Sequence, residues 1–169
     1  MSKEEVSKTI QDIQHDFHFI MLEDGDMNLD NILSKFKAAI LRYGVRGVVI
    51  DPWNELEHNR PSNLTETEYT SLALGKIRKF ARVHQVHVWL VAHPTKLQKY
   101  TNGNYPVPRL YDISGSAHFY NKADNGITVY RRSKEDLTDI HISKVRFKEV
   151  GKPGMATLKF NRESGRYFS

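Results

Sequence analysis

Two polar residues, Asp51 and His93, each end a run of apolar residues that is typical of a buried β-strand. Asp51 closes the run G-V-V-I-D, and His93 closes the run V-W-L-V-A-H. In open α/β sheets, ligands gather outside the carboxyl ends of the strands, where a carboxylate can hold magnesium through water. A histidine at the neighbouring strand end could contact a phosphate beside it. From these residues alone, two other interpretations remain open. Asp51 could simply form a turn before Pro52, and His93 could be structural or merely exposed.

Two further segments have residue types that suit phosphate. Lys144 and Arg146 lie two residues apart in a predicted strand, so their side chains share one face of it. Two cations placed in this way could clamp a phosphate, as arginine fingers do at subunit boundaries; the alternative is an exposed strand face. Ser114, Gly115 and Ser116 form a small-residue turn that lets backbone amides come close to a phosphate.

The segment after His93 reads K-L-Q-K-Y-T-N-G-N-Y-P-V-P and predicts a long, mobile loop, because it is polar and rich in turn-forming residues. Basic residues and tyrosines are interleaved along it and just after it, which suits the phosphates and bases of a nucleic acid. These residues are Lys96, Lys99, Tyr100, Tyr105 and Arg109. Exposed aromatic residues in an ordinary loop are the alternative interpretation.

Histidines suggest a different chemistry, a metal-dependent phosphoesterase. The candidate ligands are His58, His84, His87, His93 and His118 together with Asp51. No two of these histidines form an H-x-H or H-x-x-x-H pair on one element. This hypothesis therefore ranks below the nucleotide-site interpretation.

Apolar periodicity predicts the elements that would position these residues. Helices are expected up to about Asp16, over residues 29–43 with a stop at Gly44, and from a capping box at Thr65 and Glu68 to about residue 83. Buried strands are expected over residues 18–22, 47–50 and 86–92. Near-continuous apolar strands that alternate with amphipathic helices indicate a parallel sheet covered on both faces.

The chain after His93 has a different character, with short strands predicted over residues 126–130, 140–147 and 155–160. They suggest a β-hairpin extension of the same sheet. The predicted fold class is therefore α/β, a parallel sheet flanked by helices with a C-terminal β-hairpin extension, in a single domain over residues 1–169.

Composition is that of one ordinary globular domain. The chain has 169 residues, of which 39% are hydrophobic and 27% charged, and a formal net charge of +5. This mild excess of positive charge permits a polyanionic partner. The absence of cysteine excludes disulfides and thiolate zinc sites. No stretch reaches the roughly 20 apolar residues of a membrane span, and the first residues are not a signal peptide, so we expect a soluble, intracellular protein without a membrane partner.

Several motifs, in order and at matching spacing, resemble the RecA-type motor of the ring-forming replicative helicases. This family includes bacterial DnaB, the phage primase-helicases and Twinkle. G-V-V-I-D-P-W resembles its Walker B strand, and V-W-L-V-A-H-P-T-K resembles the next strand. Y-D-I-S-G-S-A resembles the segment after the central DNA-binding loop. K-V-R-F-K-E-V-G-K-P-G and the closing G-R-Y resemble the last strands.

The resemblance implies a role for each candidate residue. Asp51 would organise magnesium and His93 would sense phosphate, both for the subunit's own nucleotide. Arg146 would reach the nucleotide of the neighbouring subunit, assisted by Lys144. The loop with Lys96, Lys99 and Arg109, together with residues 114–116, would face a central pore and hold single-stranded DNA by its phosphates, an interaction that depends on salt.

One part of the family pattern is missing, because no G-x-x-x-x-G-K-[ST] occurs. Gly75 and Lys76 are followed by isoleucine, and Gly151 and Lys152 by proline. We therefore expect a partial RecA-like domain, truncated at the N-terminus, that has no tightly bound cofactor and does not hydrolyse ATP alone. Loss of the strand before that loop should expose an apolar sheet edge.

In the full-length protein the resemblance implies ATP and Mg²⁺ as cofactors, a homo-oligomeric ring, expected to be a hexamer, and 5′–3′ movement on single-stranded DNA. A bacterial or phage-encoded cytoplasmic protein is expected. The alternative function is a non-catalytic RecA-like module that binds single-stranded DNA or joins a motor ring.

Overall fold

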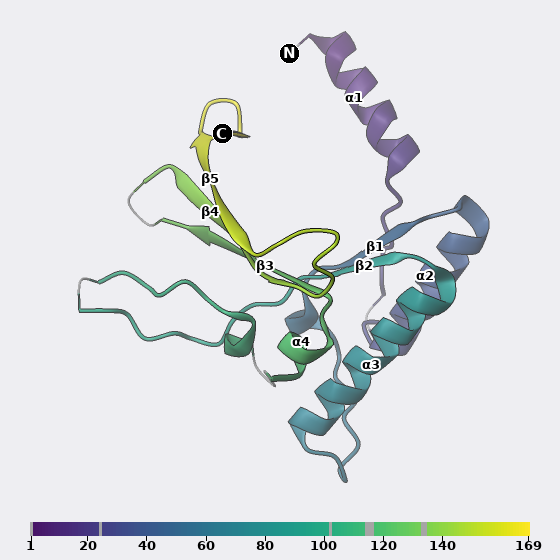
Figure 1. Cartoon of the computed structure of the whole chain (residues 1–169). Coiled ribbons are helices and arrows are strands. Elements are labelled where there is room, and N and C mark those ends of the chain that lie inside the picture. Colours follow the sequence, from purple (N-terminus) through teal and green to yellow (C-terminus); the bar gives the residue numbers. More distant parts are fainter. Residues whose placement is uncertain (1, 24, 102, 114–116, 133–134) are drawn as a thin grey trace.

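The computed structural model describes residues 2–23, 25–101, 103–113, 117–132 and 135–169 (Figure 1). Its helices and strands follow one another in the order α1 (Lys3–Asp16), α2 (Leu29–Tyr43), β1 (Gly47–Ile50), η1 (Trp53–Glu55), α3 (Glu66–His84), β2 (His87–Leu90), η2 (Leu110–Asp112), α4 (Ala117–Lys122), β3 (Asn125–Arg131), β4 (Leu137–Val145), β5 (Gly154–Asn161) and β6 (Arg166–Phe168).

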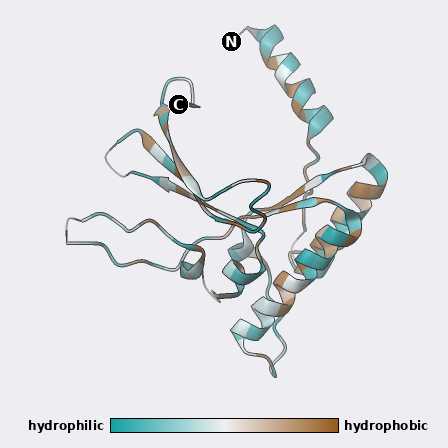
Figure 2. Ribbon diagram, viewed as in Figure 1, coloured by the Kyte–Doolittle hydropathy of each residue, from teal (hydrophilic) through white to brown (hydrophobic). Residues whose placement is uncertain are grey.

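The first layer is a parallel pair of strands with two helices on one side. β1 and β2 pair in parallel, with Val48 opposite Val88 and Ile50 opposite Leu90. α2 and α3 lie on one side of this pair, and Figure 2 shows hydrophobic residues in the strands and in parts of both helices. Val48 and Ile50 are buried in a core that also includes Phe36 and Phe80, whose ring centroids are 6.4 Å apart. Burial of these side chains is the main stabilising contribution.

Local signals in the sequence explain where these helices begin and end. The predicted capping box of α3 is confirmed, since the Glu68 N–H donates to Thr65 Oγ1 and the Thr65 N–H donates to Glu68 Oε2. α2 begins at the cap Asn28 and ends at Gly44, which has the left-handed φ of 69° that glycine adopts without strain. The predicted N-terminal helix is also confirmed as α1, which stands away from the rest of the molecule and buries no residue (Figure 1).

Two expectations about the parallel layer were wrong. Residues 18–22 form no strand; His18 instead stacks on Tyr43 with ring centroids 4.3 Å apart, and Ile20 and Leu22 pack half-buried against the core. The sheet is also not covered on both faces. α2 and α3 share one face, and the side chains that alternate to the other face stay open, with Val49 56% and Trp89 50% exposed. The apolar pattern of a strand indicates that its side chains are suited to burial, but it does not specify which element will cover them.

The C-terminal half forms a second sheet. β3, β4, β5 and β6 pair in sequence order, all antiparallel, with an irregularity between Gly126 and Ile127. The predicted β-hairpin extension is confirmed, but it is separate from the parallel pair, not a continuation of it. An isolated antiparallel bridge between Pro94 and Ile113 lies outside both sheets.

A buried ionic cluster fastens the second sheet. Arg132 donates through Nε and Nη2 to the two carboxylate oxygens of Asp139 at 2.9 and 3.0 Å, and Thr157 Oγ1 donates to Asp139 Oδ1 at 2.7 Å. Asp139 is only 5% exposed. The hydrogen bond from Arg132 first, and that from Thr157 second, lower the pKa of Asp139 below its ordinary value of 3.8.

We expect this cluster to contribute stability that is lost in acid. Because the folded-state pKa of Asp139 is depressed, its contribution is complete above pH 3.8 and disappears as the pH falls through the folded-state value. Asp139→Asn should therefore lower the urea midpoint strongly at pH 7, and the gap to the unsubstituted protein should narrow below about pH 4. Exposed Asp12→Asn is the control. A gap that stays constant from pH 7 to pH 3 would contradict the assignment.

Candidate functional site

The carboxyl ends of β1 and β2 are joined beyond the last paired residues. The Val91 N–H donates to the Ile50 carbonyl at 2.9 Å, and the Trp53 N–H donates to the Val91 carbonyl at 2.7 Å. The His93 N–H then donates to Asn54 Oδ1 at 2.7 Å. Asp51 and His93 therefore lie at the same end of the parallel pair, as the strand pattern predicted. Asn54, which ties the two segments together, was not identified from the sequence, because its partner lies 39 residues away.

The Asp51 carboxylate is available for a ligand. Asp51 is exposed, and no hydrogen bond or ion pair joins its side chain to another residue in the described part of the chain. A single free carboxylate fits an outer contact to magnesium through water, since Mg²⁺ keeps several of its waters in nucleotide sites. The described residues contain no group of three or more histidines, cysteines or carboxylates that could hold a metal ion directly.

A buried tryptophan anchors the segment that carries Asp51. Trp53 is 5% exposed and packs edge-on against Phe119 of α4, with ring centroids 5.8 Å apart. Its other neighbour is His58, at 4.6 Å. Burial is the main cause that lowers the pKa of His58, which favours the neutral imidazole in this apolar contact. Trp53 thus connects the end of β1 to α4, a role that the motif G-V-V-I-D-P-W did not reveal.

Lys144 and Arg146 are both engaged within the same chain. Lys144 Nζ donates to the Tyr120 carbonyl and lies 4.6 Å from the centroid of the Tyr120 ring. Arg146 Nη2 donates to the carbonyl oxygens of Asn121 at 2.9 Å and Ala123 at 3.3 Å. Burial first, and the adjacent Arg146 charge second, lower the pKa of Lys144. The predicted pair does share one location, and it faces the C-terminal end of α4.

Asp124 completes this cationic cluster. Arg146 Nε forms an ion pair with Asp124 Oδ1 at 2.6 Å, and Arg78 Nη2 of α3 lies 3.5 Å from the same oxygen. In the described part of the chain, no hydrogen bond or ion pair joins Lys144 or Arg146 to Asp51 or His93. The four predicted nucleotide-site residues thus form two separate pairs, one at the end of the parallel strands and one between β4 and α4.

The loop after His93 (residues 95–101 and 103–112, called the basic arm) is held by hydrogen bonds at its base and near its far end. At its base, Thr95 donates through its N–H and its Oγ1 to the Asp112 carbonyl at 2.7 and 2.9 Å. At its tip, the Tyr100 N–H donates to the Asn104 carbonyl at 2.8 Å. Figure 1 shows the arm extending away from the helices, toward the side of β3 and β4.

The basic residues of the arm stay accessible. Lys96 and Arg109 are exposed, and Lys99 Nζ lies 4.9 Å from the centroid of the Tyr105 ring. This placement is compatible with contact to a polyanion. The other predicted DNA contacts, Ser114, Gly115 and Ser116, lie outside the described residues.

The histidines of the alternative metal site are dispersed. His58 packs on Trp53 and also lies 5.6 Å from the Tyr69 ring centroid. His84 packs on Phe80 at 4.5 Å and His87 on Trp89 at 4.6 Å. The geometry of the described residues therefore offers no support for a phosphoesterase.

The chain is 48% identical, over 173 aligned residues and 99% of its length, to the Twinkle homolog protein, chloroplastic/mitochondrial, of Arabidopsis thaliana. It spans only 24% of that relative's length. A DnaB-like replicative helicase, solved in a study of its interactions with primase, superposes with a TM-score of 0.74 at 22% identity, covering 99% of this chain and 41% of that one. No family model matches the chain.

The parallel strands, the helices that cover them and the antiparallel extension define a RecA-type α/β domain of the kind found in DnaB-like helicases. With 48% identity along nearly its whole length, the chain is similar to part of a Twinkle homolog, and its fold is that of a DnaB-like helicase domain.

The expected location was wrong. A bacterial or phage-encoded cytoplasmic protein was expected from the sequence, whereas the curated relative is chloroplastic and mitochondrial, which points to an organelle. The motifs resemble those of bacterial, phage and organellar helicases alike, so they do not indicate a cellular compartment. In the part of the chain that the structure describes, no helix is long and apolar enough to span a membrane.

Proposed function

We propose that this chain forms part of the motor of an ATP-dependent replicative DNA helicase that acts in an organelle. The observation that carries the proposal is the joined end of β1 and β2, where Asp51 and His93 lie together in a chain that is 48% identical to a Twinkle homolog. By analogy with ring helicases, the complete protein would be a homo-oligomeric ring, expected to be a hexamer, that moves 5′–3′ along single-stranded DNA.

Within such a motor, ATP with Mg²⁺ supplies the phosphoryl transfer that drives movement. Asp51 would position the metal through water, and His93, held by Asn54, would contact a phosphate from the adjacent strand end. Arg146 and Lys144 would serve the nucleotide of the neighbouring subunit. The chain contains no G-x-x-x-x-G-K-[ST], so we expect no ATP hydrolysis by the isolated chain. ATP turnover stimulated by single-stranded DNA would contradict this expectation.

The missing phosphate-binding motif favours a second candidate function. In it, the chain is a non-catalytic RecA-like module that binds single-stranded DNA or joins a motor ring. The helicase and a DNA-binding module of this kind both require the basic arm to bind DNA, and they differ in whether that binding depends on nucleotide. If a longer protein that has the phosphate-binding loop binds DNA equally well with and without ATP and Mg²⁺, that result would favour the second function.

DNA binding by the arm is tested with the chain itself. Replacing both Lys96 and Lys99 with alanine should weaken binding of a fluorescent oligo-dT, measured by anisotropy, and should flatten its salt dependence. Two lost phosphate contacts reduce the slope of log K against log salt by about 1.4. Lys3→Ala with Lys8→Ala on α1 removes the same charge and is the matched control. An unchanged slope, or an equal change in the control, would reject the arm as the DNA contact.

A further inference from the structure

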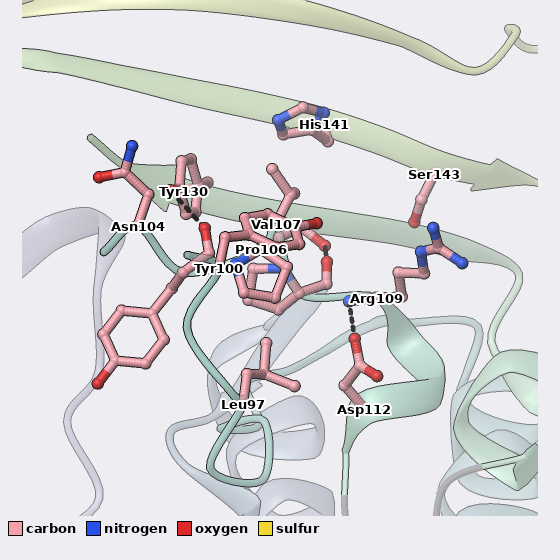
Figure 3. A pocket seen from close by; sticks show the side chains of 13 residues that line it. Leu97, Tyr100, Asn104, Pro106, Val107, Arg109, Asp112, Tyr130, His141 and Ser143 are labelled. Atoms are coloured by element: carbon pink, nitrogen blue, oxygen red, sulfur yellow. Dashed lines mark hydrogen bonds between the residues drawn. The ribbon is translucent and has the colours of Figure 1, made fainter. Parts of the chain in front are cut away.

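A cavity of about 730 Å³ lies between the basic arm and the antiparallel sheet (Figure 3). Its floor is one face of β3 and β4, from which Thr128, Tyr130, His141 and Ser143 face the arm. Thr128 pairs with His141 across the strands, and residues that alternate along a strand share a face. The volume falls within the range of about 300–1,000 Å³ that is usual for small-ligand sites.

Two nitrogen-bearing groups at this cavity are not used by the fold. His141 Nε2 is buried and has no hydrogen-bond partner in the described part of the chain. The Arg109 side chain is exposed and forms no ion pair there, because Asp112 accepts instead from the Arg109 backbone N–H at 2.7 Å. Figure 3 shows the Arg109 guanidinium directed toward Ser143. A buried polar atom without a partner is unfavourable, so the site is suited to a ligand that supplies one.

The remaining wall is aromatic and held in place. Tyr130 Oη donates to the Tyr105 carbonyl at 2.9 Å, and Thr128 Oγ1 donates to the Pro108 carbonyl at 3.1 Å. These bonds hold residues 105–108 of the arm against the sheet that contains β3 and β4. Tyr100, Tyr105 and Tyr130 all line the cavity. Aromatic rings beside an unpaired imidazole nitrogen and a guanidinium suit a planar, polar-edged, anionic ligand, as a nucleotide is.

We propose that this cavity binds one nucleotide unit of single-stranded DNA, with the base against the tyrosines, the base edge at His141 and the phosphate at Arg109. The inference rests on the proposed DNA-binding function and adds recognition of the base to it. A strand is favoured over a free nucleotide because Arg109 is the one cation in the lining, whereas Lys99 contacts the Tyr105 ring in the same arm and could hold the next phosphate.

The test compares two fluorescent oligonucleotides of equal length, oligo-dT and an abasic strand with the same phosphates. Wild-type chain should bind oligo-dT about fivefold or more tightly, because stacking of a base on aromatic side chains is strongly favourable. His141→Leu removes the contact to the base edge, so it should weaken binding of oligo-dT but not of the abasic strand and thereby reduce the preference, whereas Arg109→Ala should weaken both. His15→Leu on α1 is the matched control, and circular dichroism and thermal melting check the fold. If His141→Leu does not fold, Tyr100→Ala, which removes an exposed ring from the same lining, replaces it and should likewise reduce the preference.

Equal binding of both strands by wild-type chain, with sensitivity to Lys96 and Lys99 retained, would overturn the cavity and leave the proposed function standing. Absence of binding to either strand would overturn both. Competition by dTMP at the same concentration as oligo-dT would identify a free nucleotide as the ligand, and tighter binding of oligo-rU would identify RNA. Either result would overturn the assignment to single-stranded DNA.

Discussion

Replacing Trp53 with alanine is expected to lower the free energy of unfolding by roughly 3–5 kcal/mol, the usual cost of truncating a buried tryptophan. Trp53 is 5% exposed and lies between Phe119 and His58, so its loss leaves a cavity at the joint between β1 and α4. This joint is also the segment that carries Asp51. We expect the variant to loosen the strand end before the molecule unfolds globally.

The chain supplies its own control, since it has two tryptophans. Trp89 is 50% exposed on the open face of the parallel pair, so Trp89→Ala should change stability by much less. Chemical denaturation with circular dichroism measures both variants, and each single-tryptophan protein also reports by fluorescence. Similar losses for the two variants would show that Trp53 does not anchor this joint.

The second large effect is expected for Arg146 in a longer protein that also contains a phosphate-binding loop. If Arg146 reaches the neighbour's nucleotide, Arg146→Ala should lower ATP hydrolysis by about 10³-fold or more while nucleotide binding stays largely intact. The reason is that an arginine finger stabilises charge that develops in the transition state. Hydrolysis assays and nucleotide titrations on the same preparation measure the two quantities separately.

The structure shows the competing role for this arginine. Arg146 is bound to Asp124 and to carbonyl oxygens at the end of α4, so it could simply fasten β4 to that helix. Asp124→Asn separates the two roles because it removes the ion pair and leaves the guanidinium. A structural Arg146 predicts similar losses of thermal stability in both variants and no specific loss of hydrolysis. If Arg146 is an arginine finger, ATP hydrolysis should fall in Arg146→Ala and be largely retained in Asp124→Asn.

The three long helices α1, α2 and α3 and most strands were predictable because their signals are local, whereas the short helix α4 was not predicted. The capping box at Thr65 and Glu68 and the stop at Gly44 involve residues that are close along the chain. Apolar runs predicted β1, β2 and the strands of the C-terminal half, with ends displaced by a few residues. The placement of Asp51 and His93 at one sheet end followed from general rules for parallel strands.

The errors in the predicted fold concern elements whose packing partners lie far away in the sequence or outside the described residues. The apolar segment 18–22 has strand character, but a strand forms only where a neighbour offers its hydrogen-bonding edge, and none of the described strands does so. In the same way, the near-continuous apolar pattern of β1 and β2 did not reveal that both helices share one face of the pair.

What the sequence by itself determined is the three long helices, most of the strands, their order and the resemblance to ring helicases, because periodicity, caps and turn residues act between close neighbours. Only the tertiary structure decided which distant groups meet. It placed Asn54 against the His93 backbone, Arg146 against Asp124, and the basic arm over His141. Such contacts depend on how sheets and loops pack in three dimensions, and the spacing of residues along the chain has no direct relation to them.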